Sequence, residues 1–292
     1  MLYVPGNNLK LIEKALNLNM DAVILDLEDA VPMADKETAR SNVRESIALF
    51  KATGVYVFVR VNSLETGLTE DDLHVVVADG LDGIMLAKAE IDINKVDAML
   101  STCETKSGLK AGDIKVVPLV ESALGVINSY ALVTSTPRIE AIAFGAGDYL
   151  RDLGGDITTV SDEQTELLYA RSHIVNCCKA ARVQAIDTPY LTSLKDTDRF
   201  LNEVKIAKTL GFSGKQCIHP NQITPVNESF SPLPEKVAYS IRLVAAFEEA
   251  EKQGMGAVSF EGKMIDRMSY LQAKELLARN DAIVQREKKS PM

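Results

Sequence analysis

Short, continuous apolar runs recur along this chain, and this pattern constrains its fold more than any other feature. Eight such runs are separated by polar stretches with helical patterning. Strands that are apolar without alternation suit a parallel sheet covered on both faces. The runs are LYV (2–4), AVILDL (22–27), VYVFVRV (55–61), GIMLAK (83–88), KVVPLVE (115–121), AIAFGAG (141–147), QAIDTPYL (184–191) and GKQCIH (214–219).

Eight strand–helix units within about 220 residues match a (β/α)₈ barrel in number and length. A doubly wound open sheet is the second choice. It is disfavoured because no run is followed by a G-x-G-x-x-G turn, and GAGDY (145–149) lacks the third glycine of that fingerprint.

The segments between the runs are typical of helices, most clearly at 8–18, 35–52, 161–182 and 196–211. Ser161 and Gln164 have the spacing of a capping box, which predicts a helix that begins at Ser161. Gly211 stands where a glycine commonly ends a helix.

The composition changes after the eighth run. Residues 220–236 contain four prolines and predict an extended linker, followed by a helix at 237–254. Residues 256–278 predict a short strand or loop and a further helix. We therefore expect a catalytic barrel at 1–225, and a linker with a C-terminal helical segment at 226–292. That segment is too short to be expected to hold its own core, so it should pack on the barrel or on a neighbouring subunit, and we expect the latter.

Charge and composition exclude several classes of function. The formal net charge of −9 over 292 residues argues against nucleic-acid and anionic-membrane partners. No apolar run approaches the roughly 18 residues of a membrane span. The first residues, MLYVPGNN, have neither a basic nor an apolar signal region, so we expect no secretion signal. The four cysteines have no metal-binding spacing, which favours a cytoplasmic location, or the mitochondrial matrix for a eukaryotic chain.

Polar side chains that can bind a metal, an anion or a proton stand at the ends of most runs. In a (β/α)₈ barrel the active site lies at the carboxyl ends of the strands. Any one of these residues alone is more often a helix cap, but together they favour an active site. The strand-end groups are Asp26, Glu28, Asp29, Arg60, Asn62, Lys88, Glu90, Glu121, Asp148, Asp187 and His219.

Glu121 and Asp148 end consecutive runs. Neighbouring strands are about 4.8 Å apart, so the two carboxylates can converge on one cation. Carboxylates without nearby histidine or cysteine ligands suit Mg²⁺. Arg60 could bind a substrate carboxylate in a bidentate manner.

Eight segments resemble, in order from residue 2 to about 275, the citrate lyase β-subunit-like group of the HpcH/HpaI aldolase superfamily. That group includes malyl-CoA and citramalyl-CoA lyases. The resemblance implies a Mg²⁺-dependent (β/α)₈ barrel, a homotrimer or dimer of trimers, that makes or breaks carbon–carbon bonds beside a thioester. The segments are LYVPGNN, DAVILDLEDAV with KETAR, VRVNSLETGL, PLVESALG, AFGAGDYL, QAIDTPY, GFSGKQCIHPNQI and FEGKMID.

The resemblance also implies roles for individual residues. Glu121 and Asp148 correspond to the metal ligands, with Glu121 also facing the substrate, and Arg60 corresponds to the arginine that grips the 2-oxo acid. Asp266 corresponds to an acid/base residue delivered by the neighbouring subunit. The positions that correspond to the coenzyme A site are Tyr3, Lys10, Lys14 and His219.

The expected reaction cleaves a 3-hydroxyacyl-CoA of the citramalyl-CoA or malyl-CoA type to acetyl-CoA and pyruvate or glyoxylate. The alternatives within the family are a citrate lyase β subunit acting on an acyl-carrier-protein thioester, and a malyl-CoA thioesterase or malate synthase-like enzyme. A Schiff-base aldolase using Lys88 and a non-catalytic acyl-CoA sensor complete the alternatives.

Overall fold

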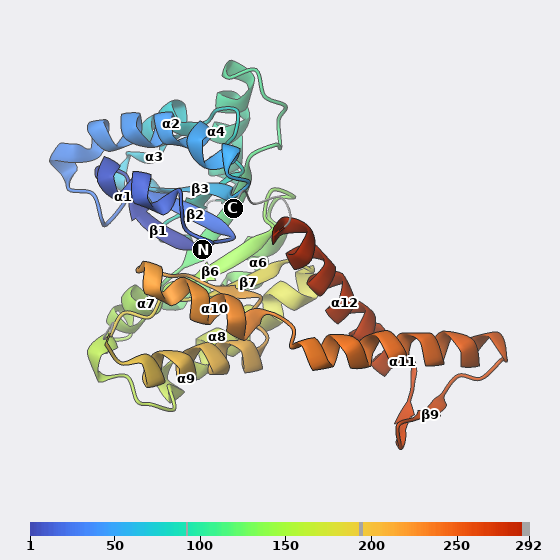
Figure 1. Cartoon of the computed structure of the whole chain (residues 1–292). Coiled ribbons are helices and arrows are strands. Elements are labelled where there is room, and N and C mark those ends of the chain that lie inside the picture. The colour runs from blue at the N-terminus through green and yellow to red at the C-terminus, as the bar shows by residue number, and fades with distance from the viewer. Residues whose placement is uncertain (92, 193–194, 288–292) are drawn as a thin grey trace. The chain divides into compact units, whose positions relative to one another are not determined.

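The computed structural model describes residues 1–91, 93–192 and 195–287, and it divides the chain into two compact units, Met1–Ser229 and Phe230–Met292. The division falls four residues after the expected boundary between 225 and 226. The two units are coloured blue to yellow-orange and orange to red in Figure 1.

The first unit contains eight parallel strands that pair in sequence order, from β1 to β8. The sheet closes on itself because Leu2 forms a parallel bridge with Cys217, whose N–H donates to the Met1 carbonyl at 2.7 Å. The prediction of a (β/α)₈ barrel is therefore confirmed. The strands are β1 (Leu2–Pro5), β2 (Ala22–Asp26), β3 (Tyr56–Val61), β4 (Gly83–Leu86), β5 (Lys115–Val120), β6 (Ala141–Phe144), β7 (Gln184–Asp187) and β8 (Gly214–Lys215).

Helices follow the strands along the chain, as Figure 1 shows. They cover the outer face of the sheet, which explains why β2, β4 and β6 are buried along their whole length. The α-helices of this unit are α1 (Leu9–Ala15), α2 (Lys36–Ala52), α3 (Thr69–Val76), α4 (Ile93–Lys106), α5 (Ala123–Ile127), α6 (Ser129–Thr134), α7 (Ala146–Asp152), α8 (Thr165–Ala181), α9 (Thr197–Leu210) and α10 (Ile223–Phe230).

The interior of the barrel is filled by side chains from alternating strand positions. These side chains form one apolar cluster beneath the polar strand ends, and Tyr3 and Phe58 pack against it. A filled interior of this kind supports the strand ends as a rigid platform. The cluster consists of Ile24, Met85, Val117, Leu119, Ala141, Ala143 and Ile186.

Two helix boundaries test the expected caps. Gly211 ends α9 in the left-handed conformation, with φ at 103°, as predicted. The capping box at Ser161 is wrong, because α8 begins at Thr165. The Gln164 side chain is buried and donates to Glu203 at 2.7 Å, so it is not available to reach back to Ser161.

The predicted linker at 220–236 is also wrong over most of its length. A 3₁₀ turn, η4 (Pro220–Gln222), leads directly into α10. Pro220 and Pro225 fall in first turns, where a missing N–H costs no helical hydrogen bond. Ile223, Val226 and Phe230 are buried, and this burial stabilises a helix that the prolines did not suggest.

The second unit consists of α11 (Pro234–Lys252), the antiparallel strands β9 (Val258–Phe260) and β10 (Lys263–Ile265), and α12 (Arg267–Glu287). Leu243, Phe247, Ile265 and Tyr270 form an apolar cluster within it. The expectation that this segment cannot hold a core of its own is therefore wrong. Its docking on a neighbouring subunit stays a prediction.

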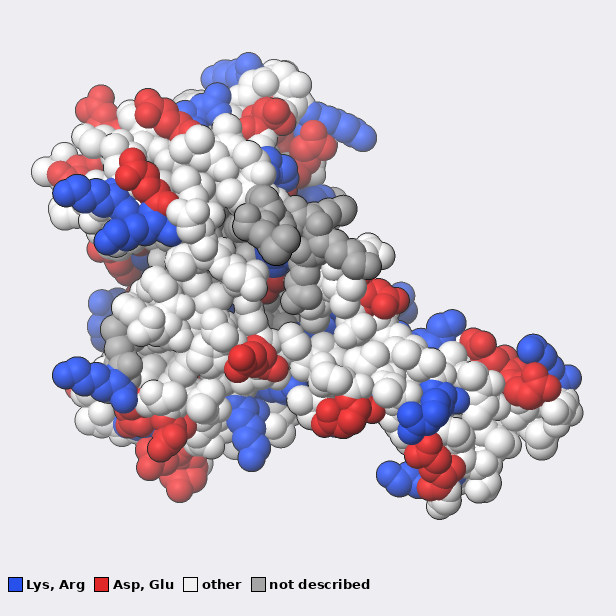
Figure 2. Space-filling model, viewed as in Figure 1, with Lys and Arg blue, Asp and Glu red and all other residues white. Residues whose placement is uncertain are grey.

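Both signs of charge are mixed over the visible surface of each unit in Figure 2. Among the described residues, no helix is both long and apolar enough to cross a membrane.

Candidate active site

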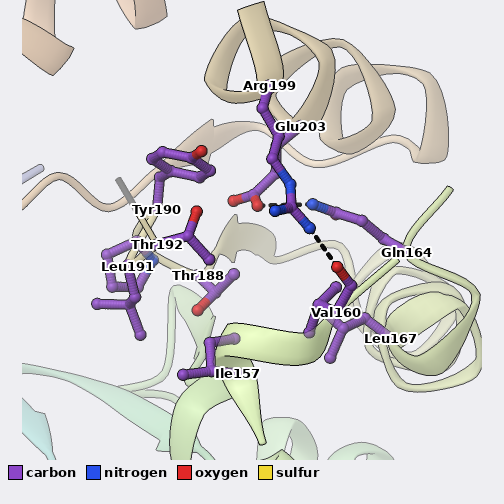
Figure 3. Close-up of a pocket in the computed structure, with 11 residues that line it drawn as sticks. Ile157, Val160, Gln164, Leu167, Thr188, Tyr190, Leu191, Thr192, Arg199 and Glu203 are labelled. Atoms are coloured by element: carbon purple, nitrogen blue, oxygen red, sulfur yellow. Dashed lines mark hydrogen bonds between the residues drawn. The ribbon is translucent and has the colours of Figure 1, made fainter. Parts of the chain in front are cut away.

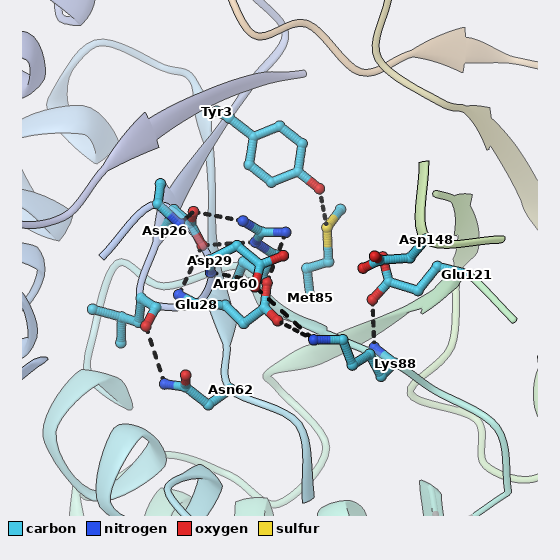
Figure 4. Close-up of polar contacts among 12 residues, drawn as sticks. Tyr3, Asp26, Glu28, Asp29, Arg60, Asn62, Met85, Lys88, Glu121 and Asp148 are labelled. Carbon is cyan, nitrogen blue, oxygen red and sulfur yellow. Dashed lines mark hydrogen bonds and ion pairs between the residues drawn. The ribbon is translucent and has the colours of Figure 1, made fainter. Parts of the chain in front are cut away.

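The carboxyl ends of β2 to β6 bring a group of charged side chains together, and Figure 4 shows them converging. Asp26 is the last residue of β2, and the strand register places it opposite Arg60 on β3. Glu121 directly follows β5, and Asp148 lies in the first turn of α7, after β6. These charged side chains therefore lie together at the strand ends, where the sequence predicted a cluster.

Glu121 is 7% exposed, and one of its oxygens, Oε1, accepts the backbone N–H of Lys88 at 2.8 Å. Burial raises the pKa of Glu121 to about 8, and the negative charges of Glu28 and Asp148 add to this shift. A buried carboxylate beside other carboxylates is unfavourable unless a cation joins them. The positive charge of Arg60 lowers the pKa of Glu121, but not enough to offset the increase caused by burial.

The Glu121–Asp148 pair fits a divalent metal ion. Figure 4 shows the two carboxylates side by side, and the charge of Asp148 acts on Glu121. Gly145 makes room for them, since a Cβ on Gly145 would lie 2.7 Å from Oε2 of Glu121. Within the described part of the chain, no group of three or more His, Cys, Asp or Glu side chains forms a metal cluster. Two hard oxygen donors suit Mg²⁺, which keeps several water or substrate ligands.

Arg60 is held rigidly. Its Nε and Nη2 donate to the two oxygens of Asp26 at 2.7 and 2.6 Å, and its Nη1 lies 2.9 Å from Oε2 of Glu28. The guanidinium also lies 4.8 Å from the centre of the Tyr3 ring. Burial alone would lower the pKa of Arg60. The hydrogen bonds and charge of Asp26 outweigh burial and raise the pKa, so the guanidinium stays charged.

This arrangement limits how Arg60 can bind a substrate. An arginine has five N–H donors, and Asp26 and Glu28 engage three of them. Asp26 therefore already occupies the Nε–Nη2 edge of the guanidinium, and a substrate carboxylate cannot bind there. The donors that remain are on the two terminal nitrogens, and the predicted substrate contact must use those.

Lys88 lies between the two halves of the cluster, with its ammonium 3.0 Å from Oε1 of Glu28. Burial lowers the pKa of Lys88, but the hydrogen bond and charge of Glu28 outweigh it and raise the pKa. A Schiff-base lysine must lose its proton to act as a nucleophile. The ion pair therefore disfavours the alternative of a Schiff-base aldolase.

The four residues predicted to contact coenzyme A do not share one environment. The Tyr3 hydroxyl points into the barrel, where it donates to Gln216 at 2.7 Å and burial raises its pKa. Lys10 and Lys14 are exposed on α1. His219 caps the start of η4, and its Nδ1 accepts the N–H of Asn221 at 3.2 Å. These contacts place Tyr3 with Arg60, and their predicted roles towards coenzyme A stay predictions.

Asp266 lies in the second unit, directly after β10, and is exposed. Its Oδ1 accepts the N–H and the hydroxyl of Ser269, both at 2.9 Å, so it caps the start of α12. These hydrogen bonds lower the pKa of Asp266. Its acid/base role stays a prediction.

Three strand-end residues serve the scaffold instead of the site. Asp187 is fully buried between Arg171 and Lys215, at 2.8 and 2.7 Å. Glu90 accepts the hydroxyl of Ser122, and Asn62 accepts from Lys36 at 2.8 Å. These contacts hold their side chains.

Sequence reasoning missed Gly145 and the backbone of Lys88. The glycine pair in FGAG gave a possible signal for close approach, although nothing in the sequence indicates which glycine meets Glu121. The conformation of Lys88 has no signal in LAKAE.

A small pocket lies behind β7, between the segment after that strand and helices α8 and α9, as shown in Figure 3. It encloses about 10 Å³, which is about enough for one water molecule. Within the described ranges, the Tyr190 hydroxyl and Thr192 Oγ1 are buried there without a hydrogen-bond partner. An acyl thioester does not fit this volume, so the pocket is not the substrate site.

The fold and site together define a (β/α)₈ barrel with a pair of carboxylates, one of them buried, and a clamped arginine at the carboxyl ends of its strands. Residues 1–220 match the family described as HpcH/HpaI aldolase/citrate lyase. The chain belongs to this family.

Individual relatives agree over nearly the whole chain. The citrate lyase subunit beta of Leuconostoc mesenteroides subsp. cremoris is 34% identical over 95% of this chain and 91% of its own length. The human mitochondrial citramalyl-CoA lyase is 35% identical over 94% of this chain and 83% of its own length. The crystal structure of Mycobacterium tuberculosis CitE with magnesium, acetoacetate and coenzyme A has a TM-score of 0.74 and 28% identity, and it covers 96% of this chain and 97% of that chain.

Proposed function

We propose that this chain is a Mg²⁺-dependent carbon–carbon lyase that cleaves a 3-hydroxyacyl-CoA of the citramalyl-CoA or malyl-CoA type. The products are acetyl-CoA and a 2-oxo acid, pyruvate or glyoxylate. The carboxylate pair of buried Glu121 and half-buried Asp148, beside the clamped Arg60, carries this proposal. The relatives named citramalyl-CoA lyase, and the neighbour that holds magnesium and coenzyme A, support it.

The residues divide the work between the two halves of the substrate. Glu121 and Asp148 would hold the metal ion, which when bound supplies Lewis-acid stabilisation of negative charge on the 2-oxo acid half. Arg60 binds the carboxylate of that half through its terminal nitrogens and stays charged throughout. Asp26 and Glu28 fix the plane of the guanidinium, so the substrate is oriented before reaction. When the carbon–carbon bond breaks, the 3-hydroxyl becomes the carbonyl of the 2-oxo acid and loses its proton to solvent, and Asp266 would give a proton to the acetyl carbon.

The test is an assay of acyl-CoA thioesters for released acetyl-CoA, pyruvate and glyoxylate, with and without EDTA. Glu121→Ala and Asp148→Ala should lose turnover by at least about 100-fold, because each removes one of two metal ligands. Glu140→Ala is a matched control, because Glu140 is an exposed acid directly before β6, at the far end of that strand from Asp148. Full activity of either ligand variant in EDTA would show that the metal assignment is wrong.

A second candidate is a citrate lyase β subunit that acts on a citryl thioester of an acyl-carrier protein. The name of the Leuconostoc relative favours it. Release of oxaloacetate from citryl-acyl-carrier protein, without cleavage of any free acyl-CoA, would select this candidate over the first.

We further propose that the chain works in the cytoplasm as a homotrimer or a dimer of trimers, with Asp266 completing a neighbour's site. Its four cysteines are free and buried, which suits a reducing compartment. Asp266 belongs to the separate unit 230–292 and is exposed, so it is accessible to a neighbour. Sedimentation analysis of the purified chain tests the assembly, and a fully active monomer would contradict it.

A further inference from the structure

Lys88 has an unusual backbone at the carboxyl end of β4. Its φ is 51°, in the left-handed region that residues with side chains rarely adopt. Glycine is the usual residue for this conformation because it has no Cβ. A strained backbone kept at a functional site suggests that the strain serves that site.

The left-handed conformation aims the main chain of Lys88 at Glu121. The Lys88 N–H donates to Oε1 of Glu121 at 2.8 Å, as drawn in Figure 4. Glu121 has 7% of its surface exposed, so few solvent contacts compete with this hydrogen bond in orienting the carboxylate. The bond leaves Oε2 directed at Gly145. The backbone at Lys88 therefore sets the direction of one carboxylate of the pair.

The side chain of Lys88 makes a contact that glycine could not provide. Its Nζ donates to Oε1 of Glu28 at 3.0 Å, and Oε2 of Glu28 lies 2.9 Å from Nη1 of Arg60. Glu28 is buried and bridges the two cations. The ammonium of Lys88 therefore fixes the carboxylate that in turn fixes Arg60.

We infer that Lys88 is a positioning residue that ties the two halves of the site together. Its main chain orients the carboxylate pair at Glu121, and its ammonium orients Arg60 through Glu28. This inference rests on the proposed function, since it assigns Glu121 to the metal ion and Arg60 to the 2-oxo acid. It predicts that the two contacts can be broken separately.

The main-chain contact is tested by Mn²⁺ binding, measured by electron paramagnetic resonance on the full chain without substrate. Lys88→Met and Lys88→Val both remove the ammonium, but a β-branched valine tolerates positive φ far less than an unbranched side chain. Val should weaken Mn²⁺ binding by about 10-fold or more, in the range of other changes behind metal ligands. Met should stay within about threefold of the wild type, since an unbranched side chain tolerates the left-handed backbone that aims the N–H at Glu121.

If Lys88→Val does not fold, the comparison of Lys88→Met with Lys88→Val is replaced by a comparison of Lys88→Ala with Lys88→Asn. Asparagine tolerates the left-handed region better than alanine, so Ala should bind Mn²⁺ more weakly than Asn. Equal Mn²⁺ affinity within both pairs would overturn the main-chain role.

The side-chain contact is tested by pyruvate binding in the presence of Mg²⁺, measured by calorimetry. Lys88→Met should weaken pyruvate binding about 10-fold, and Lys88→Arg should recover most of the loss by restoring a cation beside Glu28. Lys95→Met is the matched control, because Lys95 is exposed on α4, the helix that follows β4. Unchanged pyruvate affinity in Lys88→Met would overturn this role.

Failure of the proposed function and failure of the Lys88 inference would give different binding results. Wild-type protein that binds neither Mn²⁺ nor pyruvate would overturn the proposed function, and the inference with it. Wild-type protein that binds both, with Lys88 variants indistinguishable from it, would overturn the inference alone.

Discussion

Gly145 packs so tightly against Glu121 that adding one methyl group, in Gly145→Ala, should disturb the site. A Cβ added at Gly145 would lie 2.7 Å from Oε2 of Glu121 and 2.8 Å from its Cβ. Ordinary contact begins at 3.4 Å, so the Glu121 side chain must move by about 0.7 Å (3.4 minus 2.7) in Gly145→Ala. The φ of Gly145 is −113°, so the effect is one of space and not of backbone strain.

This displacement should have two measurable costs. Overpacking in a dense region destabilises a protein by about 1–3 kcal/mol. Mg²⁺ demands nearly ideal octahedral geometry at about 2.0–2.1 Å, so a carboxylate moved by this much should weaken Mn²⁺ or Mg²⁺ binding by about 10- to 100-fold. Both are measured on one preparation, by urea unfolding and by metal titration.

Gly147→Ala is the matched control, two residues along the chain. Its Cβ would lie 3.2 Å from Cδ1 of Leu191, the flexible end of a side chain. Gly147 lies within α7, where alanine is favoured over glycine by up to about 1 kcal/mol. We expect metal affinity within about twofold of the wild type. Wild-type metal affinity and stability in Gly145→Ala would refute the role assigned to this glycine.

Three further predictions follow from single residues. Arg60→Lys keeps a charge but loses the paired hydrogen bonds to Asp26, so kcat/KM should fall by about 100-fold or more, and a wild-type value would exclude the role. Burial alone would raise the pKa of Asp187, but Arg171 and the neighbouring lysine outweigh it and lower the pKa. That stabilisation is present above the unfolded pKa of about 3.9 and is lost as pH falls through the lower folded value, so the urea midpoint should drop more steeply below about pH 4 in the wild type than in Asp187→Asn. Mixing inactive Asp266→Asn and Glu121→Ala subunits under exchange conditions should restore activity if Asp266 acts in trans, whereas no mixture recovers if it acts in cis.

The barrel could be predicted because burial on both faces leaves a direct signal in the sequence. A strand such as AVILD has no polar residue before its end, and all five of its residues are buried in the structure. Helix boundaries were harder, since they depend on tertiary contacts. Gln164 has the spacing of a capping residue, yet its amide belongs to a buried network with Glu203 and Arg171. The prolines at 220–236 likewise favoured a linker where the structure has α10, because burial of the apolar face of α10 stabilises the helix.

The site could be located from the sequence but not oriented. Asp26 and Asp187 both end strands, and each is opposite a cation in the neighbouring strand, Arg60 and Lys215 respectively. Asp26 joins the cluster at the barrel mouth, whereas Asp187 turns to Arg171 and the outer helices. A shift of one residue in register changes the face on which a side chain lies, and a single sequence does not fix that register.

To act as a general acid, Asp266 needs a higher pKa than its surroundings in the single chain give it. A general acid works best when its pKa lies near the working pH. In this chain Asp266 is exposed, and the two hydrogen bonds from Ser269 lower its pKa, so it is ionised at neutral pH and has no proton to give. Burial against another surface raises the pKa of a carboxyl group, which a neighbouring subunit would supply. We therefore expect Asp266 to titrate at a higher pH in the assembled enzyme than in dissociated subunits, as measured by carboxyl NMR. The same depressed pKa in both states would leave Asp266 as a helix cap and assign the proton transfer to another group.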